Sequence, residues 1–110
     1  MVVVVEYLYR DAGNYKLWGK ILLSNRKNLD VRCAEQTIRS VLIDGEFFVA
    51  EDLGIPVLRF EQRDSDLDHG WHEFHSLQEA APAHRSSPPR DLADFLRELH
   101  AASHKWKRIC

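Results

Sequence analysis

Hydrophobic residues dominate the N-terminal segment of the chain. Residues 2–9 (VVVVEYLY) combine four valines with two tyrosines, and β-branched and aromatic residues favour strands. Glu6 is the only charged residue among them, which indicates a strand at a central position of its sheet. Turn-forming residues follow at 11–14, and residues 15–23 then alternate between apolar and polar side chains. The pattern predicts a β-hairpin over residues 2–23.

A helical spacing of apolar residues follows a polar break at residues 24–28. Asn28 or Asp30 can cap the N-terminus of this helix with a side-chain oxygen. Gly45 follows the last apolar position and is expected to end the helix in a left-handed conformation. The apolar positions that recur with the period of a helix are Val31, Ala34, Ile38, Val41 and Leu42.

Shorter apolar segments, separated by turn-forming residues, occupy the middle of the chain. Residues 46–50 predict a third strand, residues 51–56 a helical turn or tight corner, and residues 57–60 a short fourth strand. An acidic loop over residues 61–70 leads to a last strand over residues 71–77. Alternation in this last strand places Trp71, Glu73, His75 and Leu77 on one face and His72, Phe74 and Ser76 on the other.

The C-terminal third begins with a linker and continues as a helix. Residues 80–90 (AAPAHRSSPPR) contain three prolines and two serines, a composition typical of linkers. Ser87 can cap a final helix over residues 91–106, with Pro88 in its first turn. This helix could dock on its own sheet or on that of a partner. Its apolar stripe consists of Leu92, Phe95, Leu96, Leu99, Ala102 and Trp106.

The element order β-β-α-β-(β)-β-α predicts a single α+β domain over residues 1–110. Strands and helices alternate too irregularly for a doubly wound sheet. We therefore expect a small antiparallel or mixed sheet of four to five strands with two helices packed on one face. A strand edge left open at residues 46–50 or 71–77 would allow a homodimer to form.

The cysteines and the apolar segments favour a cytoplasmic location. Cys33 and Cys110 are too few for a disulfide framework, and we expect both to be reduced thiols. The apolar run at residues 2–5 is too short for a signal peptide. No apolar stretch approaches the roughly 20 residues that a membrane-spanning helix needs.

Charge is distributed unevenly along the chain. The formal net charge of −2 argues against general binding to a phosphate backbone. Residues 1–43 carry a net charge of +3, residues 44–79 carry −8 and residues 80–110 carry +3. The acidic segment could steer association with a protein partner that has a basic surface. Alternatively, its carboxylates neutralise the basic residues within the fold.

The densest candidate chemistry is the segment DSDLDHGWHEFHS. Imidazoles and carboxylates bind divalent transition metals, which makes His69, His72 and His75 candidate ligands. Their spacing differs from H-E-x-x-H, and in a strand His72 would point away from His75. A solvated loop that leads into an edge strand explains the same residues without a metal, so no cofactor is the first expectation.

The same segment could support acid–base chemistry. Glu73 could orient His75 as a general base, and Asp68 could do the same for His69. A small metal-dependent hydrolase or nuclease that uses His69, His72, Glu73 and His75 is therefore an alternative function. No G-x-S-x-G motif supplies a nucleophile, and the scattered glycines form no phosphate-binding loop.

Two tryptophans are candidate contact residues. Trp18 shares a strand face with Lys16 and Lys20, a combination found in platforms for single-stranded nucleic acid. An indole packed under the lysine stems gives the same pattern. Trp106 lies in a basic tail and could anchor a partner or cap the core of the protein itself.

The absence of a catalytic motif and the segregated charge together favour a small interaction module that is not an enzyme. Such a module could be an adaptor, an inhibitor or an antitoxin-like protein. The residues expected to contact a protein partner are Asp64, Asp66, Asp68, Glu73 and Trp106. Metal-dependent catalysis and nucleic-acid binding remain the alternatives.

Overall fold

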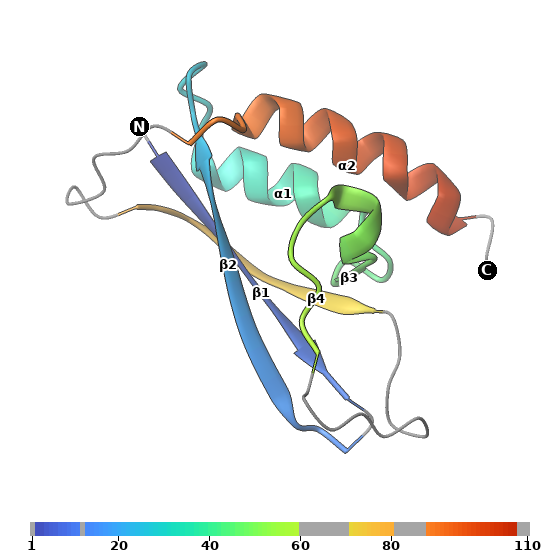
Figure 1. Ribbon diagram of the computed structural model, residues 1–110. Coiled ribbons are helices and arrows are strands. Elements are labelled where there is room, and N and C mark those ends of the chain that lie inside the picture. Colours follow the sequence, from blue (N-terminus) through green and yellow to red (C-terminus); the bar gives the residue numbers. More distant parts are fainter. Residues whose placement is uncertain (1, 12, 60–70, 81–87, 108–110) are drawn as a thin grey trace.

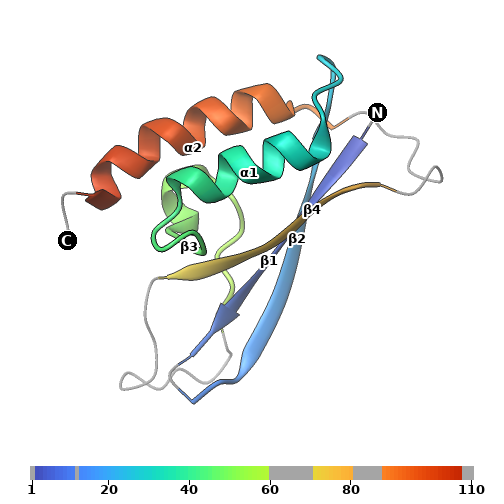
Figure 2. The same ribbon diagram turned by 180° about the vertical axis from the view of Figure 1, so that it is seen from behind.

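The computed structural model describes residues 2–11, 13–59, 71–80 and 88–107 (Figure 1). Its elements are β1 (Val2–Arg10), β2 (Lys16–Ser24), α1 (Val31–Val41), β3 (Phe47–Phe48), the 3₁₀ turn η1 (Ala50–Leu53), β4 (His72–Glu79) and α2 (Leu92–Lys107). The strands form one antiparallel sheet in the order β2-β1-β4-β3. Both helices lie side by side on one face of this curled sheet (Figures 1 and 2). The predicted α+β class, with two helices on one face, is confirmed.

We call the face under the helices the inner face and the opposite one the outer face. The hairpin forms as predicted, with β1 and β2 paired from Val2↔Ser24 to Arg10↔Lys16. β1 is central because β4 pairs along its other edge. Of the two segments predicted to leave an edge open, residues 46–50 contain the edge strand β3, and β3 pairs with β4 only at residues 72–73. The other edge strand is β2.

A β-bulge in β4 changes which side chains face the core. Glu6 of β1 pairs with Ser76, but Tyr7 pairs with Phe74, so His75 is an extra residue in β4. Because the bulge shifts the alternation by one residue, Phe74 and Leu77 are both buried. The prediction that Leu77 lies on the face opposite Phe74 was therefore wrong.

α1 begins where the sequence predicts but is capped differently. Asp30 is the N-cap residue, yet its carboxylate accepts a hydrogen bond from the Cys33 thiol (3.2 Å) rather than from a backbone amide. Leu42 follows the helix in an extended conformation. Gly45 (φ 73°) does not cap the helix as predicted, because it forms a tight turn with Asp44 (φ 52°) that leads into β3.

The third strand is shorter than the predicted range 46–50. Only two residues of β3 pair with β4. The following residues form η1, and Gly54 ends it in a left-handed conformation (φ 65°). This is the tight corner that the sequence predicted over residues 51–56.

The segment after η1 crosses the inner face instead of joining the sheet. The Tyr7 hydroxyl donates a hydrogen bond to the carbonyl of Pro56 (2.6 Å). The backbone amide of Leu58 donates a hydrogen bond to Nε2 of His72 (3.0 Å). This amide is therefore bonded to a side chain and not to the backbone of a neighbouring strand. The strand predicted at 57–60 is accordingly absent over its described residues, 57–59.

α2 is attached to the hairpin at its N-terminus. Asp91 is the residue that caps the helix, because its carboxylate accepts a hydrogen bond from the amide of Ala93 (3.1 Å). The other oxygen of this carboxylate accepts from the amide of Arg26 (2.9 Å). The predicted cap at Ser87 lies outside the described residues, and Pro88 precedes the helix instead of lying in its first turn. Among the described residues, no helix has the length and apolar character needed to cross a bilayer.

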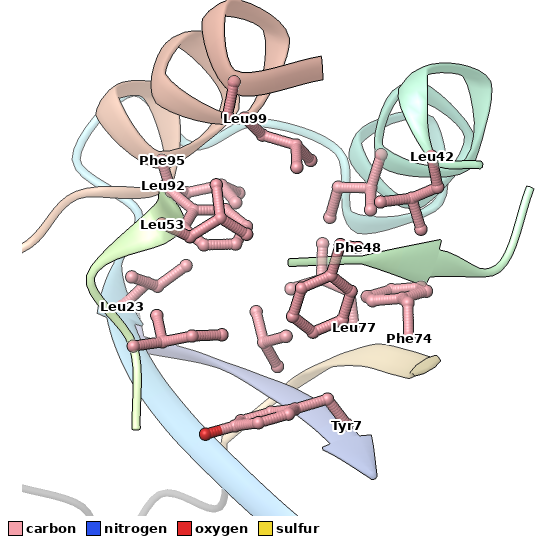
Figure 3. Close-up of a cluster of buried hydrophobic side chains, with 14 of the residues drawn as sticks. Tyr7, Leu23, Leu42, Phe48, Leu53, Phe74, Leu77, Leu92, Phe95 and Leu99 are labelled. Atoms are coloured by element: carbon pink, nitrogen blue, oxygen red, sulfur yellow. The ribbon is translucent and has the colours of Figure 1, made fainter. Parts of the chain in front are cut away.

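The core lies between the inner face and the two helices (Figure 3). α2 contributes the whole of its predicted stripe except Leu96, which is only partly buried, so the helix docks on its own sheet. The large buried side chains come from every element: Tyr7, Leu23, Ile38, Leu42, Phe48, Leu53, Phe74, Leu77, Leu92, Phe95, Leu99 and Trp106.

Candidate binding face of the sheet

The outer face carries the side chains that alternate with the core residues of the hairpin. In β1 these include Glu6, which is half-buried, and Leu8, which is 4% exposed. The register places Lys20 opposite Glu6 and Trp18 opposite Leu8. Neither α1 nor α2 covers this face (Figures 1 and 2).

Trp18 is the main apolar feature of the outer face. Its side chain is 55% exposed, although tryptophan is usually well buried. The ring of His75 contacts the indole in an edge-to-face arrangement, with the ring centroids 5.0 Å apart and an interplanar angle of 84°. Since β1 lies between β2 and β4, this contact bridges the central strand and limits the movement of the indole.

An open hollow of about 420 Å³ lies beside the indole and is lined by Glu6, Trp18, Gly19 and Lys20. On the inner side of the same strand, a Cβ atom at Gly19 would lie 3.0 Å from Leu58 Cδ2 and 3.0 Å from Tyr7 Cζ. A side chain at this position would press on Leu58 and Tyr7, so glycine lets the crossing segment pack closely against β2. The hollow combines an apolar wall with one carboxylate and one ammonium group.

Two exposed lysines, Lys16 and Lys20, lie next to Trp18. Neither forms an ion pair with any described residue. In contrast, Arg10 on the same hairpin binds Glu73 (3.0 Å). The three residues predicted as a nucleic-acid contact thus share one exposed face, and their two cations are available to an anionic ligand.

The histidines of the predicted metal cluster do not converge. His72 is buried on the inner face, where the rings of Tyr7, Tyr9 and Phe48 surround it at centroid distances of 5.4–6.0 Å. His75 lies on the outer face, so the sheet separates the two imidazoles. A hydrolase site that uses both would need them on the same side. Within the described ranges, no three potential ligands come together.

The acidic segment is partly neutralised inside the fold. Glu73 binds Arg10, Glu51 binds Arg59 (3.4 Å) and Asp52 lies 3.9 Å from Lys105. The pairs of Glu51 and Asp52 are exposed on at least one side and contribute little stability, whereas the Glu73 side chain is only 18% exposed. These pairs nevertheless reduce the uncompensated charge. Asp64, Asp66, Asp68 and His69 lie outside the described residues.

Trp106 belongs to the core. It is 1% exposed, and its indole Nε1 donates a hydrogen bond to Oδ2 of Asp52 (2.9 Å). Of the two roles that the sequence allowed, the structure shows core capping. A partner could reach this side chain only if the end of α2 moved away from η1.

Cys33 is exposed on α1. The hydrogen bond to Asp30, together with the charge of that carboxylate, raises the pKa of the thiol. Since the thiolate is the reactive form, this environment does not activate Cys33 as a nucleophile.

Sequence reasoning missed two features. The contact between His75 and Trp18 depends on the β-bulge, which leaves no clear pattern in the sequence. The other feature is the pair His100 and His104 in α2, whose rings lie 4.9 Å apart. The spacing of four residues in a predicted helix was a readable signal for that pair.

Comparison with known proteins finds no matching family model, no matching curated protein and no matching solved structure. The functional inferences below therefore depend on the sequence and the geometry alone.

Proposed function

We propose that this protein is a non-catalytic interaction module that binds a protein partner through the outer face of its sheet, with Trp18 as the central contact. The observation that supports this most is the exposed indole, held by His75 beside an open hollow. Tryptophan is enriched among the residues that dominate binding energy at interfaces. A reduced Cys33 is consistent with a cytoplasmic location for this role.

Charge defines the chemistry of the proposed partner. The hollow beside Trp18 suits an apolar side chain, and carboxylates on the partner would pair with Lys16 and Lys20. Among the described strands β2 pairs only with β1, so an extended segment of the partner could also add to its free edge. A segment that mixes apolar and acidic residues meets both conditions.

Substitution of Trp18 by alanine is expected to weaken partner binding at least tenfold, or about 1.4 kcal/mol. The side chain is exposed, so the variant should fold normally. The partner is first isolated from an extract of the source cells on tagged protein, and its affinity is then measured by calorimetry.

Tyr15→Ala is the matched control for this experiment. Tyr15 is 67% exposed on the same hairpin but does not line the hollow. We expect its replacement to leave the affinity unchanged. Equal affinities for the wild type and the Trp18 variant would contradict the proposal. Loss of self-association in that variant would identify the partner as a second copy of the chain.

Single-stranded nucleic acid is the second candidate, because two exposed lysines flank an aromatic side chain that a base can stack on. Nuclease treatment of the extract distinguishes the candidates, since it would remove a nucleic-acid ligand and leave a protein partner bound. Glu6 lies opposite Lys20 in the sheet, and Glu73 of β4 pairs with Arg10 of β1, so carboxylates reduce the net positive charge near Trp18 and favour the protein partner.

The acidic loop is proposed as a separate contact with a basic region of the partner. Exchange of Asp64, Asp66 and Asp68 for asparagine should lower the association rate about tenfold or more at low salt and remove much of its salt dependence. Stopped-flow measurements at two ionic strengths test this. An unchanged rate at low salt would exclude the loop from the interface.

A further inference from the structure

An exposed pair of histidines lies on α2, away from the outer face of the sheet. His100 and His104 are both exposed, and four residues separate them along the helix. Their rings are in edge-to-face contact, with centroids 4.9 Å apart and an interplanar angle of 86°. Neither side chain contributes to the core, so the fold does not explain why both are present.

We propose that His100 and His104 form a two-nitrogen site for a divalent transition metal such as Cu²⁺, Ni²⁺ or Zn²⁺. Residues four apart on a helix lie on the same face, with Cβ atoms about 6 Å apart. This is the spacing at which the two histidines of H-E-x-x-H bind one zinc ion. Imidazole nitrogen is a preferred ligand for all three metals.

The surroundings of the pair permit a cation. Arg97, one turn before His100, is bound to Asp94, and Lys105, next to His104, lies near Asp52. Toward α1, His100 borders a hollow of about 280 Å³. The α1 residues that line it, Thr37 and Val41, are uncharged. The rings need only side-chain rotation to direct a nitrogen each at one ion, and exposed side chains rotate freely.

The site is open. No group of three potential ligands is found in residues 2–11, 13–59, 71–80 and 88–107. Water or a ligand from another molecule would therefore complete the coordination. Since the pair spans a full turn of α2, bound metal should stabilise the helix and, through it, the folded state.

Metal titration of the full chain tests the proposal. Cu²⁺, Ni²⁺ and Zn²⁺ are each added alone in a non-chelating buffer and followed by calorimetry, and thermal unfolding is followed by circular dichroism. We expect one site of the highest affinity and an unfolding midpoint that rises with metal concentration. Electron paramagnetic resonance of the Cu²⁺ complex should show two nitrogen ligands.

The variants assign the site to its residues. His100→Gln and His104→Gln should each weaken binding at least tenfold and remove the rise in the unfolding midpoint. His84→Gln, which removes a histidine outside α2, should change neither. The double variant Arg97→His, His100→Gln keeps six histidines but places two of them seven residues apart on α2, about 10 Å along the axis, and should also lose the site.

Three results would overturn the proposal. One is the absence of metal binding by the wild-type protein. Another is unchanged affinity in His100→Gln and His104→Gln, and the third is wild-type affinity in the double variant. The α2 variants alter exposed side chains, and the circular dichroism spectra of all four variants without metal establish that they fold.

Discussion

Replacement of Trp106 by alanine is expected to lower the free energy of unfolding by about 3–5 kcal/mol. The indole is 1% exposed and lies in the core cluster, where its removal would leave a large cavity. The hydrogen bond from Nε1 to Asp52 would also be lost. Urea unfolding followed by circular dichroism measures the change, since this signal does not depend on the deleted fluorophore.

The consequence of this loss depends on the total free energy of unfolding, which is small for domains of this size. A total of about 5–15 kcal/mol is typical, and at the lower end of this range the alanine variant is expected to be partly unfolded at 37 °C. Trp106→Phe keeps an aromatic ring and should lower the free energy of unfolding by less than Trp106→Ala does. Arg97→Ala, an exposed change on the same helix, should change stability by less than about 0.5 kcal/mol. A loss below 1 kcal/mol in Trp106→Ala would show that the end of α2 is not packed as described.

Replacement of Asp91 by alanine is expected to lower the free energy of unfolding by about 2–3 kcal/mol, because one buried carboxylate accepts hydrogen bonds from both α2 and the end of the hairpin. It caps α2 through the amide of Ala93 and fixes the end of the hairpin through the amide of Arg26. The backbone of the preceding residue, Arg90, also accepts a hydrogen bond from the amide of Ser24 (2.9 Å). Loss of the side chain would therefore loosen the junction between β2 and α2.

The contribution of Asp91 to the free energy of unfolding should depend on pH. The hydrogen bond from the Arg26 amide, followed by that from Ala93 and the positive charges of Arg26 and Lys27, lowers the pKa of this carboxyl. A carboxyl with a lowered pKa in the folded state stabilises the protein above its unfolded-state pKa of about 3.9. That stability is lost as the pH falls through the lower, folded-state pKa.

A comparison with Asp91→Asn isolates this charge. The difference in unfolding free energy between the wild type and Asp91→Asn should stay constant above about pH 5 and shrink below about pH 4. Urea titrations from pH 3 to pH 7 provide the measurement. A difference that does not change over this range would mean that the ionised form of Asp91 has no special role at the junction.

Local patterns predicted the secondary structure well where the period was long and regular. The hairpin and both helices follow from runs of residues whose apolar positions repeat with period 2 or 3.6. The predictions failed where one tertiary contact outweighed a short pattern. Residues 57–59 look like a strand, but the Leu58 amide is bonded to His72 and the segment crosses the sheet. Gly45 is suited to a helix cap, but serves a turn instead.

The candidate site was predictable in part. Alternation along the hairpin was enough to place Lys16, Trp18 and Lys20 on one face, because neighbours two apart in a strand point the same way. The role of His75 was not predictable, since the bulge brings a residue of β4 to the indole across the central strand. The pairing of carboxylates with distant cations was equally hidden, because charges far apart in the chain meet only in the folded protein.

The amino-acid sequence by itself determined that this protein has an α+β fold, with a long N-terminal hairpin and two amphipathic helices. Hydrophobic periodicity acts over a few neighbouring residues and needs no knowledge of the rest of the chain. Only the tertiary structure decided that Trp106 is buried while Trp18 is exposed, and that His72 and His75 lie on opposite sides of the sheet. The reason is that burial depends on which elements pack on which face, and this is fixed by contacts between residues far apart in the sequence.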